Sequence, residues 1–191
     1  MRIAKELFAE LNSFDENRRI EAKSASAVGK SMMETVCAFA NEPGLCGGYL
    51  LLGAKRTGIA EDGRPVYEPE NIENTDKIQS DFVAMCNSMF YVRIRPIINV
   101  EEYLGKTVIV VKIEELPESQ KPAYFAKRGL PEGAFRRIGP SDEKCSEEDM
   151  YLFYQSADTY DSCIVDDADL DDIDENALNF YRKLRERGRG D

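Results

Sequence analysis

The spacing of apolar and polar positions changes repeatedly between residues 16 and 53. Residues 19–23 form a short, charged segment with strand character. The apolar positions that follow recur three or four residues apart, as on one face of a helix: Met32, Met33, Val36, Cys37 and Ala40. Pro43 cannot continue a helix, and Gly44 suits a left-handed helix end. Because the apolar run 49–52 has the length of a buried strand, the pattern predicts strand, helix, glycine turn and strand.

Similar patterns predict the elements in the rest of the chain. Residues 107–113 are dense in β-branched side chains and form the clearest strand, which we expect to pair with residues 91–100 in an antiparallel hairpin with a slightly long loop. The segment 55–74 is interrupted by glycine and proline, so it is interpreted as an irregular excursion with a turn at 61–63. The remaining expected elements are amphipathic helices over 1–12 and 76–89, short strands over 123–126 and 134–138, and a helix capped by Ser146.

These elements predict an α+β fold, in which helices 29–41 and 76–89 pack on a mixed, largely antiparallel sheet of five to seven strands. A chain of 191 residues fits one domain, which we place at 1–157. Nine acidic residues and no base occur between Asp158 and Glu175, so 158–175 is interpreted as an acidic linker. Apolar positions at near-helical spacing predict a C-terminal helix over 176–191.

Composition excludes several classes of function and location. The chain contains no histidine, which excludes His-dependent catalytic triads and the usual zinc sites. Its five cysteines are scattered without a Cys-x-x-Cys pair, as expected for reduced thiols, and Cys46 is interpreted as a packing residue. No apolar window has the length of a membrane span or a secretory signal. We therefore expect a cytoplasmic protein with no membrane partner.

Two separated sets of residues resemble one known family. The first set is Glu16-x4-Glu21-x-Lys23, followed by the helix end at Asn41 and by Gly47-Gly48-x-Leu50-Leu51-Leu52-Gly53. The second set is Lys121-Pro122-x-Tyr124, followed by Arg137-Ile138-Gly139-x-Ser141. Their order resembles the Schlafen AlbA-like domain, also called divergent AAA. The resemblance implies a DNA-binding domain of transcriptional-regulator-like proteins, with an ATPase-like region and a winged helix often following downstream. No Walker motif is present, and Gly47-Gly48 is interpreted as a structural turn.

Glu16, Glu21 and Lys23 are the candidate catalytic residues if the domain is a nuclease. In the Schlafen branch, the two matching glutamates and a third carboxylate resemble a metal-dependent nuclease centre. Glu16 and Glu21 would then bind Mg²⁺ or Mn²⁺, which prefer oxygen ligands. The third acid is replaced here by Lys55-Arg56, and Asp62 would substitute only if its loop folded back. The alternative interpretation is a surface ion pair between Glu21 and Lys23, of little value to stability.

Three pairs of adjacent basic residues are the candidate phosphate contacts: Lys55 and Arg56, Lys127 and Arg128, and Arg136 and Arg137. Each pair is predicted at a strand end or in a loop, where side chains reach a ligand easily. Arg93 and Arg95 add two more cations. The net charge of −11 opposes polyanion binding, but much of the acidic excess lies after Gln155. The competing interpretation is a solvated face whose bases are balanced by acids.

We therefore expect a regulatory nucleic-acid-binding domain that contacts phosphates through its paired bases with little base specificity. Two alternatives come from other classes. One is a divalent-metal nuclease that uses Glu16 and Glu21, with Mg²⁺ or Mn²⁺ as its cofactor. The other is a protein-interaction or assembly module, including a homo-oligomer, in which the acidic segment binds a basic partner. The positions of the carboxylates and of the paired bases in three dimensions separate these readings.

Overall fold

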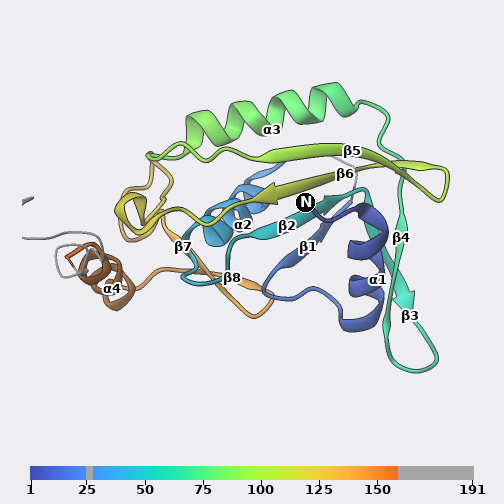
Figure 1. Cartoon of the computed structure of the whole chain (residues 1–191), viewed down its shortest axis with the longest axis horizontal. Helices are drawn as coiled ribbons and strands as arrows, with labels where there is room; N and C mark the ends of the chain where they lie inside the picture. Colours follow the sequence, from blue (N-terminus) through green and yellow to red (C-terminus); the bar gives the residue numbers. More distant parts are fainter. Residues whose placement is uncertain (25–27, 159–191) are drawn as a thin grey trace, which may run out of the picture. The chain divides into compact units, whose positions relative to one another are not determined.

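The computed structural model describes residues 1–24 and 28–158, with the side chains of 155–158 left aside. Figure 1 shows how these residues are arranged. The helices of the described part are α1 (Ala4–Phe14), α2 (Lys30–Asn41), α3 (Thr75–Met89), α4 (Glu147–Asp158) and the 3-10 helix η1 (Glu118–Gln120). Its strands are β1 (Ile20–Lys23), β2 (Gly48–Leu52), β3 (Ala54–Ile59), β4 (Pro65–Pro69), β5 (Ile97–Tyr103), β6 (Lys106–Ile113), β7 (Phe135–Ile138) and β8 (Ser141–Lys144).

The central sheet has four strands in the order β1-β2-β6-β5 (Figure 1). β1 and β2 are parallel because α2 carries the chain back between them, whereas β2–β6 and β6–β5 are antiparallel. The hairpins β3–β4 and β7–β8 are separate two-stranded sheets. This arrangement confirms the predicted α+β fold with a mixed, largely antiparallel sheet, but the sheet has four strands rather than the expected five to seven, because the two hairpins form sheets of their own.

Apolar side chains are buried on both faces of the central sheet. On one face, Leu50 and Leu52 of β2 belong to the same core cluster as residues of α2 and α3, including Phe39 and Phe82. On the other face, Leu51 of β2 packs in a second cluster that includes four residues of α1, namely Ala4, Leu7, Phe8 and Leu11. Successive strand residues point to opposite faces, so covering both faces explains the unbroken apolar run in β2.

The turn between α2 and β2 requires glycine for steric reasons. Gly47 has φ +74°, and a Cβ there would lie 1.9 Å from the carbonyl oxygen of Ile113. A Cβ at Gly48 would meet the ring of Phe39 at 2.6 Å. The side-chain amide of Asn41 donates to the carbonyl oxygens of Ala123 and Phe135 at 2.8 and 3.0 Å. The predicted structural turn is therefore confirmed.

The structure differs from the predicted elements at several points. Residues 54–69 form the β3–β4 hairpin rather than an irregular excursion, although the turn at 61–63 is where it was expected. β5 starts at Ile97 rather than Tyr91, and it joins β6 through the tight turn Leu104–Gly105 instead of a longer loop. Both turn residues have positive φ, 50° and 71°, as a two-residue type I′ hairpin requires.

Smaller differences affect the remaining elements. Residues 123–126 make only isolated bridges, at Tyr124 and Phe125, and β8 was not predicted. Cys46 is exposed rather than packed. The predicted cap of α4 is confirmed, because Asp149 N–H donates to Ser146 Oγ at 3.2 Å. The predicted linker and C-terminal helix lie beyond residue 158, outside the described residues.

Candidate nucleic-acid interface

Arg137 of β7 lies at the centre of a buried charge network. Its side chain is fully buried, with 0% of its surface exposed. The Nη2 group donates to Glu21 Oε2 at 2.7 Å and to the carbonyl oxygen of Asn17 at 3.0 Å. The Nη1 group donates to Asp142 Oδ1 at 2.7 Å, and the guanidinium carbon lies 5.1 Å from the centre of the Phe39 ring. Arg137 therefore joins β7, β8 and the segment around β1.

Neighbouring side chains complete this network. Lys23 Nζ donates to Glu21 Oε1 at 2.6 Å, so both carboxylate oxygens of Glu21 are bound to cations. Thr35 Oγ1 donates to the second carboxylate oxygen of Asp142 at 2.6 Å. Burial raises the pKa of Asp142 above its usual value, although these hydrogen bonds and Arg137 oppose the change. The ion pair of Glu21 with Lys23 in the alternative interpretation is present, but its expected place at the surface is wrong, because Glu21 is buried and also binds Arg137.

Glu16 lies close enough to this network for the charges of Glu21 and Lys23 to affect its pKa. Its Oε1 accepts a hydrogen bond from the backbone N–H of Ala22 at 2.9 Å. Burial, followed by the negative charge of Glu21, raises the pKa of Glu16 above its usual value. Glu16, Glu21 and Lys23 are therefore brought together, as their matched motif implies.

These residues do not fit a divalent metal ion. Among residues 1–24 and 28–158, no three acidic or cysteine side chains are grouped as metal ligands. Glu21 is neutralised by Lys23 and Arg137, which leaves little charge for Mg²⁺ or Mn²⁺. Asp62 lies in the turn of the β3–β4 hairpin and pairs with Arg64 there. The arrangement is that of a structural ion network that joins β7 to β1 of the central sheet.

The six predicted phosphate contacts occupy three kinds of environment. Lys55 and Arg56 of β3 are exposed, and each faces one acid, Glu70 at 3.9 Å and Asp15 at 3.2 Å. Lys127 is exposed and makes no ion pair with a described residue. Arg128, Arg136 and Arg137 form the third group.

The third group is committed to contacts within the domain. Arg128 pairs with Glu34 at 2.9 Å and lies over the Phe125 ring, 4.4 Å from its centre. Arg136 is about three-quarters buried and binds both Glu42 and Asp149. Together with the buried Arg137, these side chains stabilise the position of β7. Sequence alone does not distinguish such arginines from ligand-binding ones.

A different set of basic residues surrounds Tyr49 on the central sheet. Lys112 of β6 is the strand partner of Tyr49, and its Nζ lies 4.9 Å from the ring centre. The guanidinium of Arg2 lies 5.9 Å from the same ring. Arg19 directly precedes β1, and its carbonyl oxygen accepts the Tyr49 N–H at 2.7 Å. We call Arg2, Arg19, Tyr49 and Lys112 the central basic row.

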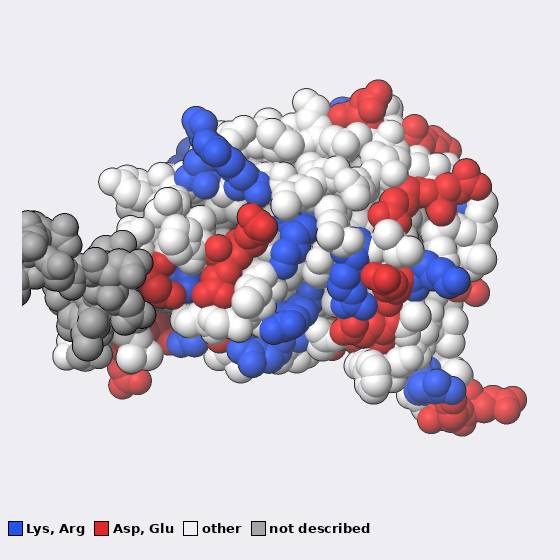
Figure 2. All heavy atoms as spheres, viewed as in Figure 1, with Lys and Arg blue, Asp and Glu red and all other residues white. Residues whose placement is uncertain are grey.

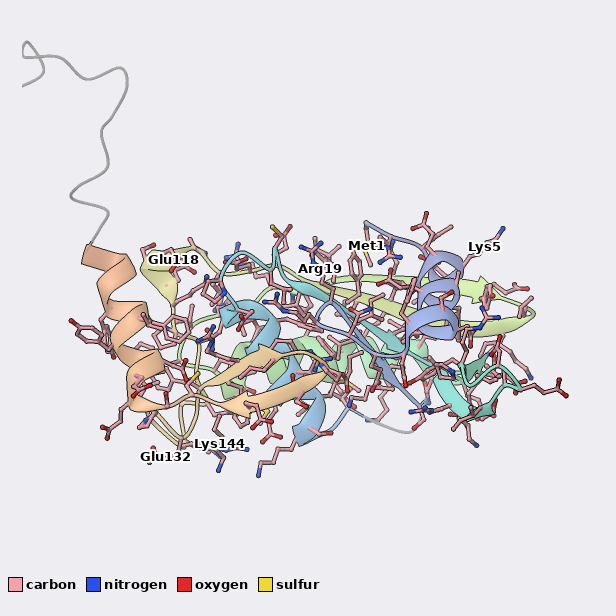
Figure 3. All side chains as sticks on the ribbon, turned by 90° about the horizontal axis from the view of Figure 1, so that it is seen from below. Met1, Lys5, Arg19, Glu118, Glu132 and Lys144 are labelled. Atoms are coloured by element: carbon pink, nitrogen blue, oxygen red, sulfur yellow. The ribbon has the colours of Figure 1, made fainter. Side chains whose placement is uncertain are left out.

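Two cations of this row make no ion pair within the described part of the chain. Arg2 pairs with Glu10 at 2.7 Å, but neither Arg19 nor Lys112 makes an ion pair with a described residue. Burial lowers the pKa of Lys112, and the charge of Arg19 acts in the same direction, whereas Glu114 opposes it. Figure 2 shows basic side chains near the middle of the viewed face, with acidic side chains between several of them. In Figure 3, Arg19 lies on the same side as Lys5, and Lys144 lies on the opposite side.

The sequence contains one signal for this row outside the family motifs. Lys112 is the single charged residue between Thr107 and Ile113, in a strand that is otherwise apolar. A cation at such a position must reach solvent or a partner, and here its Nζ donates to the carbonyl oxygen of Cys46 at 2.6 Å. Its partner Tyr49 follows from the strand register, which the sequence did not provide.

Comparisons with known proteins support one family. The family described as Schlafen, AlbA_2 matches residues 16–146. A solution NMR structure is 51% identical in sequence, with a TM-score of 0.63, and the match covers 76% of this chain and 95% of the other. That structure is the N-terminal domain of a RecG-related protein from Nitrosomonas europaea, named as a candidate ATP-dependent DNA helicase.

A second structural match is more distant. The crystal structure of the DIP2311 protein from Corynebacterium diphtheriae is 16% identical with a TM-score of 0.47, and the match covers 80% of this chain and 28% of that one. A search of curated proteins found no match. Within the described residues, no helix has both the length and the apolar character needed to cross a membrane.

Proposed function

Because the chain belongs to the Schlafen AlbA_2 family, we propose that it is a nucleic-acid-binding domain of a regulator-like protein that contacts backbone phosphates. The observation that carries this proposal is the pair Arg19 and Lys112, which lie on either side of Tyr49 and make no ion pair with a described residue. Two such charges repel each other, and a phosphate between them would replace repulsion by attraction. The 51% identical domain belongs to a RecG-related protein named as a candidate DNA helicase, which supports the same proposal.

The proposal divides the predicted basic contacts into two groups. Lys55, Arg56 and Lys127 are exposed and remain candidates for weaker phosphate contacts. Arg128, Arg136 and Arg137 are assigned to the scaffold, because their guanidinium groups already bind acids within the domain. Contacts of this kind bind the backbone, so the domain should discriminate little between base sequences.

The test is binding of labelled DNA and RNA at low and at high salt. Phosphate contacts release counterions, so affinity should be measurable at low salt and should fall steeply as salt increases. No measurable affinity for either polymer at low salt would remove the proposal.

The nuclease alternative has less support from the geometry of Glu16 and Glu21. Both lie in one network, but Glu21 is neutralised by two cations and no third acid joins them among the described residues. Incubation of labelled RNA and DNA with Mn²⁺ tests it, with the double variant Glu16→Gln, Glu21→Gln beside the parent. Cleavage by the parent and not by the variant would reverse the ranking.

A further inference from the structure

The segment between α3 and β5 presents alternate side chains to solvent. Tyr91, Arg93 and Arg95 are exposed, and Tyr91 has 72% of its surface accessible. Between them, Val92 is half-buried and Ile94 is buried in the core cluster that includes α2 and α3. The buried Ile94 therefore anchors the segment and leaves an aromatic ring and two cations on its outer side.

The ring of Tyr91 is held in place by a second tyrosine. It stacks on Tyr124 with ring centres 5.0 Å apart and an angle of 13° between their planes. The Tyr91 N–H donates to the carbonyl oxygen of Tyr124 at 3.0 Å, and the next residues, Phe90 and Phe125, form a β-bridge. Since both backbones are linked, the exposed ring is a rigid platform that is ordered before a ligand arrives.

Arg93 and Arg95 line a groove of about 370 Å³. Neither arginine makes an ion pair with a described residue. Two acids, Glu114 and Glu115, line the same groove. Glu115 is already bound by Lys121 Nζ at 2.7 Å and by the N–H groups of Gly44 and Cys46.

The groove lies beside the central basic row, and its two acids differ in how far they are compensated. Burial alone would raise the pKa of Glu115. The hydrogen bonds from Lys121 and from the backbone together outweigh burial, so the pKa of Glu115 is below its usual value. Glu115 therefore stays ionised and is compensated in part by Lys121, which also binds Glu118 at 2.7 Å. The two arginines of the groove face Glu114 and the remaining charge of Glu115. Glu114 also acts electrostatically on Lys112, so the groove and the row are neighbours.

We propose that Tyr91, Arg93 and Arg95 form a subsite for single-stranded nucleic acid. An unpaired base stacks on the open face of Tyr91, and the adjoining phosphates contact Arg93 and Arg95. Stacking on an aromatic ring is tolerant of sequence and needs a base that has left its duplex, so the subsite selects single strands over duplexes. This inference rests on the proposed function and names its ligand class.

The experiment compares a labelled single strand with a duplex of the same length. Tyr91→Ala should weaken single-strand binding about tenfold. It should leave duplex binding within about twofold, because the central basic row, which does not include Tyr91, binds the duplex phosphates. Tyr91→Phe keeps the ring and should retain parent affinity. Tyr151→Ala is the matched control, since Tyr151 of α4 is also exposed, at 62%, but lies beside the acids Glu147 and Glu148 rather than beside arginines. Thermal unfolding should be unchanged in Tyr91→Phe and Tyr151→Ala, and Tyr91→Ala should lose only the stacking with Tyr124, about 1 kcal/mol, and remain folded in the assay.

The outcomes separate this inference from the proposed function. If the parent binds nucleic acid and Tyr91→Ala binds the single strand as tightly as the parent, the subsite is wrong and the function stands. The same conclusion follows if Tyr91→Ala weakens single-strand and duplex binding equally. If the parent binds neither polymer at low salt, the proposed function itself fails.

Discussion

Arg137 and Glu21 are 116 residues apart in sequence and are joined by a buried hydrogen bond of 2.7 Å between Nη2 and Oε2. The two residues come from the two segments that first indicated the family. Their contact gives those segments a shared physical role, because it binds β7 to the edge strand β1. The matched motifs are therefore explained at least in part by the requirements of the fold.

Removal of Arg137 should destabilise the domain strongly. Arg137→Met leaves the buried Glu21 and the half-buried Asp142 without their shared cation, and breaking a buried pair in this way costs about 3–5 kcal/mol. Chemical denaturation measures the free energy of unfolding. The control Lys127→Met removes an exposed charge and should change that free energy by less than about 0.5 kcal/mol. Equal stability of the two variants would show that the network contributes little.

The turn before β2 offers a matched comparison of two glycines. Gly44 and Gly47 have similar positive φ, 70° and 74°, so alanine should be strained in the same way at both. A Cβ at Gly44 meets nothing within 4 Å, whereas at Gly47 it would lie 1.9 Å from a backbone oxygen. Gly44→Ala should therefore cost about 1 kcal/mol and Gly47→Ala clearly more. Denaturation midpoints that coincide would contradict the close approach.

Glu16 should make stability depend on pH in a defined direction. The pKa of Glu16 is raised above its usual value of 4.5 in the folded state. Between 4.5 and the raised pKa, the folded state therefore binds more protons than the unfolded state. Its contribution to stability is present at low pH and is lost as pH rises through the folded pKa. Glu16→Gln keeps the oxygen that accepts the Ala22 N–H and removes the charge.

The measurement is the free energy of unfolding of the parent and of Glu16→Gln as a function of pH. The variant should gain stability relative to the parent as pH rises from 4.5 through the raised pKa, and the difference should be constant above it. A difference that shrinks with rising pH would mean that the environment favours the charged carboxylate.

Elements with a strong apolar period were predictable from sequence. α2 and β2 were found because Met33, Val36 and Leu50 must be buried, and burial sets their spacing. β3 and β8 were missed because their residues are mostly exposed, so no apolar alternation marks them. The start of β5 was placed too early, since the alternation of Tyr91–Arg95 reflects exposure on an extended segment rather than strand pairing.

The candidate site was less predictable because it depends on long-range pairing. Arg137 resembles any exposed arginine until β7 places it against Glu21. Likewise, the role of Lys112 could not be predicted without the strand register, which places it opposite Tyr49. Local sequence indicates where basic residues occur, but the fold decides which of them are neutralised.

The salt dependence of nucleic-acid binding tests the central claim most directly. Each phosphate contact contributes about 0.7–0.9 to the slope of log affinity against log salt, so Arg19→Gln, Lys112→Gln should reduce the slope by about 1.4–1.8. The control Lys106→Gln, Lys144→Gln also removes two exposed charges that have no ion pair with a described residue. Its slope should equal that of the parent. Equal slopes for the two double variants would contradict the assignment of Arg19 and Lys112 as phosphate contacts.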